Sequence, residues 1–173
     1  HGIKRNIPTK NEVKSTSGET VNRAKISDIK VSDPFTTESE SGELIIKIGK
    51  SSEYVKGRKA YTISYHYDLG RDRFQNFDEL YFNIIGTAWD CKISNVKFKI
   101  TMPAEFDQTK LGFSTGSYGF SGYDNDLSFT VTGNVISGTY NGVLKARQGI
   151  TVSCELPDGY FSEAKDTMIT QII

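Results

Sequence analysis

The feature that most constrains this chain is an alternation of apolar and polar residues with a period of two. In residues 96–102 every second residue is apolar, the residues between are lysine or threonine, and Pro103 follows. Successive side chains of a β-strand point to opposite faces, so this pattern predicts a strand with one face in a core and the other in solvent. A surface helix would need apolar residues three and four positions apart.

The same alternation recurs along most of the sequence. It predicts about eight strands, which span residues 3–7, 26–31, 44–48, 61–67, 80–84, 96–102, 127–131 and 150–156. Glycine, proline, asparagine and aspartate separate these segments, as expected for turns, and a single helical turn fits within residues 72–80. We therefore predict an all-β fold, an antiparallel Greek-key or immunoglobulin-like β-sandwich with at most one or two short helical turns, forming a single domain over residues 1–173.

Two segments interrupt the pattern. Residues 9–20 are polar and rich in lysine, serine and threonine, which predicts a mobile loop. Residues 112–126 combine glycine and serine with aromatic residues, which predicts an irregular loop of a different chemical kind. Neither resembles a linker between domains.

Charge limits the classes of partner. The 21 basic residues equal the 21 acidic ones, and a balanced charge provides no general attraction to nucleic acid. No nucleic-acid partner is therefore expected. No apolar run approaches the length that spans a bilayer, so a membrane anchor is expected only outside this segment.

The sequence contains no recognisable catalytic motif, and we predict a protein that is not an enzyme and needs no cofactor. The two histidines are His1 and His66, and His66 falls on the polar phase of its strand. Asp78 and Glu79 are adjacent, so on a strand they would point to opposite faces and could not act together on one bond. A turn cap or a solvated acidic patch explains this pair better than catalysis does.

The glycine-rich loop carries the candidate binding residues Tyr118, Phe120 and Tyr123. Aromatic rings on a glycine and serine backbone are typical of adaptable binding loops, because they offer a large contact area at low entropic cost. The alternative is that the rings fold back and cover one end of the sandwich, since exposed aromatic clusters are uncommon without a partner.

Asp124 and Asp126 form a second, weaker candidate in the same loop. Their carboxylates could bind Ca²⁺, which prefers oxygen ligands from loops, but the spacing of an EF-hand is absent. Aspartates in a tight turn account for the same residues, so no metal site is predicted with them.

Two cysteines, Cys91 and Cys154, both fall on the apolar phase of their segments. This position predicts two buried free thiols. A disulfide between them would require their Cα atoms to lie within about 7 Å, which the sequence leaves open.

Several segments together resemble a known family. They are HGIKRNIP at residues 1–8, LIIKIG at 44–49, YTISYHY at 61–67, FDELYFNIIGTAWDCKISNVKFKITMP at 77–103, the serine-threonine-glycine stretch at 114–119, and ITVSCELPDGYF at 150–161. In this order they resemble the extracytoplasmic N-terminal domain of the YciQ-like predicted membrane proteins of bacteria, a domain of unknown function. The resemblance implies a signal sequence and a strand before these residues, a transmembrane region after them, and a location on the extracytoplasmic face of the membrane.

The resemblance also implies structural roles for Arg5, Gly86 and Trp89. Arg5 is expected to be held for structure, in an ion pair with Asp78 or Glu79. Gly86 and Trp89 are expected to form a corner between strands, where glycine adopts a positive φ and the indole fills the core beside it.

Three functions remain open from the sequence. The first is a sensing or protein-interaction module on the cell surface. The second is a carbohydrate-binding domain that stacks envelope glycan on Tyr118, Phe120 and Tyr123. The third is a hydrolase whose site is completed by residues outside this segment.

Overall fold

The computed structural model describes residues 2–15, 18–50, 52–70 and 76–161, and within them the fold is all-β, as predicted. Apart from one 3₁₀ turn at Gln108–Lys110, the regular elements of this part of the chain are thirteen strands. Every described pair of strands is antiparallel. His1 lies outside the described residues.

The strands divide into two compact units, one formed by the described residues up to 70 and the other by those from 76 onward. The prediction of one domain over residues 1–173 stays a prediction.

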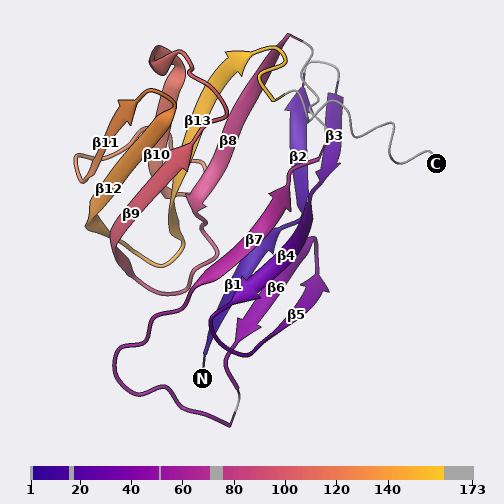
Figure 1. Ribbon diagram of the computed structural model, residues 1–173, viewed down its shortest axis with the longest axis vertical. Helices are drawn as coiled ribbons and strands as arrows, with labels where there is room; N and C mark the ends of the chain where they lie inside the picture. Colours follow the sequence, from indigo (N-terminus) through magenta and orange to yellow (C-terminus); the bar gives the residue numbers. More distant parts are fainter. Residues whose placement is uncertain (1, 16–17, 51, 71–75, 162–173) are drawn as a thin grey trace, which may run out of the picture. The chain divides into compact units, whose positions relative to one another are not determined.

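The first unit contains three small sheets (Figure 1). Their strands are β1 (Ile3–Pro8), β2 (Lys10–Ser15), β3 (Gly18–Arg23), β4 (Lys25–Val31), β5 (Phe35–Glu40), β6 (Glu43–Ile48) and β7 (Ile63–Asp68). Strand β6 is central in the sheet β1-β6-β5, while β2 pairs with β3 and β4 pairs with β7. The buried side chains of Ile7, Ile46 and Ile48 form its core, against apolar residues of β4 and β7.

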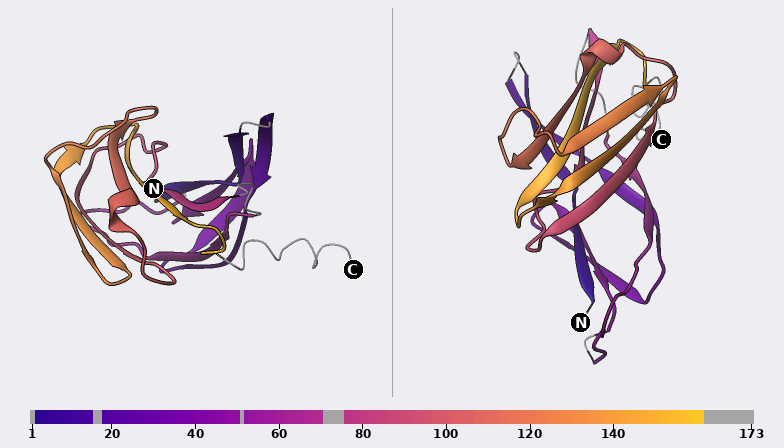
Figure 2. Two further views of the ribbon diagram at one scale, coloured as in Figure 1. Left: turned by 90° about the horizontal axis from the view of Figure 1, so that it is seen from above. Right: turned by 90° about the vertical axis from the view of Figure 1, so that its left-hand side faces the viewer.

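The second unit is a sandwich of two three-stranded sheets, β10-β13-β8 and β11-β12-β9. Its strands are β8 (Phe77–Ile85), β9 (Ile93–Thr101), β10 (Leu111–Ser117), β11 (Leu127–Thr132), β12 (Val135–Leu144) and β13 (Gln148–Pro157). Only the connection from β11 to β12 stays within one sheet, and each of the others moves the chain to the opposite sheet. Figure 2 gives two further views of these layers.

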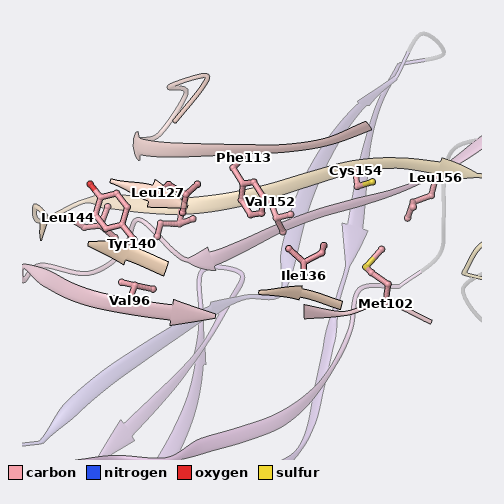
Figure 3. Packing of buried hydrophobic residues seen from close by; sticks show 11 residues of the cluster. Val96, Met102, Phe113, Leu127, Ile136, Tyr140, Leu144, Val152, Cys154 and Leu156 are labelled. Carbon is pink, nitrogen blue, oxygen red and sulfur yellow. The ribbon is translucent and has the colours of Figure 1, made fainter. Parts of the chain in front are cut away.

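The core of the second unit lies between its two sheets (Figure 3). Phe113 and Val152 project from β10 and β13, and Val96 and Ile136 project from β9 and β12 on the other side. Tyr140 lies at one end of this core, together with Leu127 and Leu144 (Figure 3). The apolar phase of the alternating pattern therefore faces inward, as predicted.

All eight predicted strands are confirmed, but five strands were missed: β2, β3, β5, β10 and β12. The prediction of a mobile loop over residues 9–20 was wrong, because β2 and β3 pair as a hairpin. A helical turn within residues 72–80 was also wrong from Phe77 onward, where β8 begins, while residues 71–75 lie outside the described part. Backbone pairing does not need an apolar face, which explains why a polar hairpin escaped a search for apolar periodicity.

The two cysteines differ from each other. Cys154 is buried at 1% exposure, as predicted, and burial raises the pKa of its thiol, with a smaller contribution from the charges of Asp107 and Glu155. Cys91 is exposed, so the prediction that it faces inward was wrong. It lies before the start of β9, where the alternation of a strand no longer applies. Both thiols are free.

Candidate functional site

The segment between β10 and β11 contains the candidate binding residues, and we name residues 117–124 the aromatic loop. Three glycines set its course, because Gly116, Gly119 and Gly122 have φ values of 126°, 83° and 88° that other residues rarely adopt. The amide of Phe120 donates a hydrogen bond to the carbonyl of Ser117 at 3.1 Å, and the amide of Thr115 donates one to Gly122 at 3.0 Å. The prediction that residues 112–126 are irregular was therefore wrong as far as Ser117, where β10 ends.

Asp124 anchors the end of the aromatic loop to the sandwich. One of its carboxylate oxygens accepts the amide of Asp126 at 3.1 Å, and the other accepts the hydroxyl of Tyr140 at 3.0 Å. Its own amide donates to the hydroxyl of Thr115 at 3.1 Å. Both carboxylate oxygens are thus used inside the turn.

The Tyr140 hydroxyl donates its hydrogen bond to Asp124 over a wide pH range. Burial, which contributes most, the hydrogen bond to Asp124 and the charges of Asp124 and Asp126 together raise the pKa of Tyr140 to about 12. The phenol therefore stays neutral near pH 7 and keeps donating to Asp124.

The three predicted aromatic residues lie in different environments. Tyr118 is 95% exposed, Phe120 60% and Tyr123 51%. The Tyr123 ring makes an edge contact with Phe129, with 6.2 Å between ring centroids, and Phe129 in turn contacts Phe113 at 4.6 Å. Tyr123 is thus tied to the core, whereas Tyr118 projects into solvent.

The aromatic loop forms one wall of a cavity of about 310 Å³, which we name the loop pocket. Phe120 and Tyr123 line it from the loop, and Tyr140, Leu144 and Gln148 line it from β12 and the start of β13. These last three residues were not predicted. Tyr140 and Leu144 occupy ordinary apolar positions of a strand, so nothing in the sequence connects them with a loop about twenty residues earlier.

Asp124 and Asp126 were considered either as ligands of a calcium ion or as residues that stabilise a tight turn. In the part of the chain that the structure describes, no three His, Cys, Asp or Glu side chains are close enough together to hold a metal ion. The carbonyl of Asp126 accepts the amide of Asn141 at 3.0 Å, so both aspartates stabilise the turn.

The residues considered for catalysis lie on strands of both units. His66 is exposed on β7, as predicted. Asp78 is buried and Glu79 is exposed on the opposite face of β8. The carboxylate of Asp78 accepts the amides of Phe161 at 2.6 Å and Gly159 at 3.4 Å, which makes it the cap of the turn that follows β13.

Structural roles were expected for Arg5, Gly86 and Trp89. Arg5 is half-buried on β1, on the same face as Ile3 and Ile7, and its ion pair with Asp78 or Glu79 stays a prediction. Gly86 is not among the described glycines with a positive φ, so that part of the expectation was wrong. Trp89 is half-buried, and its carbonyl accepts the amide of Arg147 at 2.9 Å.

Gly2, which directly precedes β1, has a steric role. A Cβ atom at this position would overlap the carbonyl of Ile48 on the neighbouring strand β6. Glycine is therefore required where the backbone enters β1 so close to its partner.

Comparison with known protein families matches residues 1–156 to the N-terminal domain of a predicted membrane protein, DUF2207. The chain belongs to this family. The expected kinship with a domain of unknown function from predicted membrane proteins is thus confirmed. Searches of curated proteins and of solved structures gave no match. Within the described residues of this DUF2207 domain, no helix is both long and apolar enough to cross a membrane.

Proposed function

We propose that this chain is a non-catalytic recognition module of a membrane protein, which binds a protein partner through the aromatic loop on the extracytoplasmic side. The observation that carries the proposal is the exposure of three aromatic side chains, at 95%, 60% and 51%, on one short loop. Large aromatic side chains dominate the binding energy of protein interfaces, and a cluster of them in solvent marks an interaction site.

The loop is held in place before any partner binds. Asp124 and Thr115 fix its end through side-chain hydrogen bonds, and the Tyr123 ring rests on Phe129. Pre-organisation of this kind lowers the entropic cost of association. Tyr118 and Phe120 are then available as contact residues on a fixed support.

A second candidate function is the recognition of envelope glycan. It is favoured by the loop pocket, where aromatic rings lie beside the polar side chains of Asp124 and Gln148. Pockets of this composition suit ligands with both apolar faces and hydroxyl groups.

Site-specific photo-crosslinking in cells tests the protein-interaction proposal. A photoreactive phenylalanine at position 118 or 120 is expected to give a covalent adduct with a second protein. The matched control is the same amino acid at Tyr81, which is 63% exposed on β8 outside the loop. Equal labelling at all three positions, or adducts at Tyr81 alone, would contradict the proposal.

Two further measurements separate the alternatives. Co-sedimentation with purified cell-wall polysaccharide, lost on replacing Phe120 and Tyr123 by alanine, would favour the glycan function instead. Protease digestion of intact cells is expected to remove the domain from the full-length protein, whereas protection in intact cells and cleavage only after permeabilisation would contradict the extracytoplasmic location.

A further inference from the structure

The loop pocket has an unusual combination of aromatic and acidic groups. The rings of Phe120, Tyr123 and Tyr140 line it together with the carboxylate of Asp124. Among the described residues that line it, none is lysine, arginine or histidine. A ligand that enters therefore meets aromatic rings and a negative charge, with no basic side chain in that lining.

The charge of Asp124 remains available to a ligand. Each carboxylate oxygen accepts a hydrogen bond, one from the amide of Asp126 and the other from the hydroxyl of Tyr140, and each oxygen can accept a second. Both donors are neutral groups, so neither cancels the charge.

A second carboxylate adds to the negative potential. Asp126 lies close enough to Tyr140 for its charge to contribute to the raised pKa of that phenol, after burial and the effects of Asp124. The carboxylate of Asp124 thus belongs to the lining of the loop pocket, whereas Asp126 is not part of that lining.

We propose that the loop pocket binds the ammonium group of a lysine side chain presented by the partner protein. This rests on the proposed function and names the chemistry of the contact. Aromatic faces attract cations through their quadrupoles, and a carboxylate beside them adds a charge-assisted hydrogen bond. A volume of about 310 Å³ is at the small end of ligand sites, which suits one side chain.

Lysine fits the site better than the two alternative ligands. Arginine binds a carboxylate best by two parallel hydrogen bonds, which would need the remaining acceptor capacity of both Asp124 oxygens at once, because each already accepts a donor. An ammonium needs only one free lone pair. A neutral sugar would stack on the rings, but it would leave the charge of Asp124 uncompensated.

Titration of the chain with a short acetylated and amidated peptide, Gly-Lys-Gly, tests the proposal by NMR. We expect amide shifts of the aromatic loop and of Tyr140 to change in a saturable way. The same peptide with its lysine acetylated on Nζ keeps the aliphatic part of the side chain but loses the positive charge. We expect its affinity to be about tenfold lower. Raising the salt concentration is expected to weaken only the charged peptide.

Two substitutions locate the effect. Asp124→Asn removes the charge but can keep the loop folded, because its amide oxygen still accepts from Asp126 and its amide nitrogen can donate to Tyr140. It is expected to weaken the lysine peptide by about tenfold, and Phe120→Leu by severalfold. Glu105→Gln, an exposed carboxylate outside the pocket lining, is the matched control and is expected to change nothing.

The outcomes separate this inference from the proposed function. Equal affinity for the peptide with a free lysine and for the peptide acetylated on Nζ would overturn the lysine site. So would the absence of saturable amide shift changes in the aromatic loop. If crosslinks at positions 118 and 120 still form, the protein-interaction proposal survives that result. If the crosslinks fail while the lysine peptide binds, the pocket chemistry stands and the protein partner is wrong.

Discussion

At the scale of single residues, Asp78 is a buried carboxylate that caps a turn. It is 2% exposed and accepts the backbone amides of Gly159 and Phe161. These two bonds join the start of β8 to the turn that follows β13. A carboxylate can accept several amides at once, so aspartate suits this position better than a neutral side chain.

Asp78→Ala is expected to destabilise the chain by about 2–3 kcal/mol, because it removes a charged acceptor from buried amide donors. Chemical denaturation measures this. The control is Glu79→Ala, whose side chain is exposed on the opposite face and whose cross-strand neighbour is Glu155. Like charges opposite each other are unfavourable, so the control should be neutral or slightly stabilising. Equal losses from both substitutions would show that Asp78 is not a buried cap.

Tyr140 gives a prediction for alkaline pH. Its pKa is raised from 10.0 to about 12 in the folded protein. The folded state therefore holds the phenol proton more tightly than the unfolded state, and this stabilisation is complete below about pH 10 and lost as the pH rises through about 12.

Tyr140→Phe is expected to remove that dependence. The variant should be less stable than the wild type near pH 7, since it lacks the hydrogen bond to Asp124. The difference in unfolding free energy should shrink between pH 10 and 12. A difference that stays constant over this range would mean that the phenol titrates equally in both states.

At the scale of elements, the sheet β11-β12-β9 depends on a glycine in its central strand. Gly138 on β12 lies opposite Phe98 on one side and Phe129 on the other. A Cβ atom at Gly138 would overlap the ring of Phe98. Phe98 in turn contacts Phe113 of the facing sheet, at 5.6 Å between centroids, so the ring has little room to move. The absence of a side chain here makes space for the aromatic core.

Gly138→Ala is therefore expected to cost about 1–3 kcal/mol through overpacking, although alanine has the better strand propensity. Thermal denaturation measures the loss. Ser137→Ala, one residue earlier and exposed on the other face, is the control and should change stability by less than about 0.5 kcal/mol. An unchanged melting temperature for Gly138→Ala would mean that the Phe98 ring moves freely.

The burial of each strand explains which strands could be predicted from the sequence. The eight strands with apolar alternation were found because each carries apolar residues, at alternate positions, that pack into a core. Strand β5 was missed since all its residues, Phe35–Glu40, are exposed. Strand β12 was missed because glycines and polar residues interrupt its apolar phase at Gly138 and Gly142. Period-two analysis detects burial on one face, and it fails where backbone pairing alone makes the strand.

At the scale of the whole molecule, the two units have separate cores. The cluster around Ile46 contains residues between Ile3 and Tyr67, and the cluster around Ile136 contains residues between Leu80 and Phe161. Among the described residues, the two clusters have no member in common. A set of strands with its own hydrophobic core can fold independently.

The fragment of residues 72–166 is therefore expected to fold by itself. It should give a dispersed amide NMR spectrum and a cooperative thermal transition, because the core, the Asp78 cap and the loop pocket all lie within it. Ile136→Ala should abolish this transition, since Ile136 is 0% exposed. A collapsed, poorly dispersed spectrum of the unmodified fragment would show that the second unit needs the first.

The sequence by itself determined the fold class, the family, and the residues of the aromatic loop. These follow from patterns among neighbours along the chain: apolar alternation, turn residues, and glycines beside aromatics. They need no knowledge of which strands pair. The opposite faces of Asp78 and Glu79 were equally predictable, because they depend only on the geometry of one strand.

Only the tertiary structure decided how distant segments meet. It brought Tyr140, Leu144 and Gln148 to the aromatic loop, buried Asp78 beside Phe161, and left Cys91 exposed. The reason is physical. Side-chain alternation fixes which face of a strand is apolar, but pairing and packing between strands far apart in sequence fix what that face touches, and the pocket exists only through those contacts.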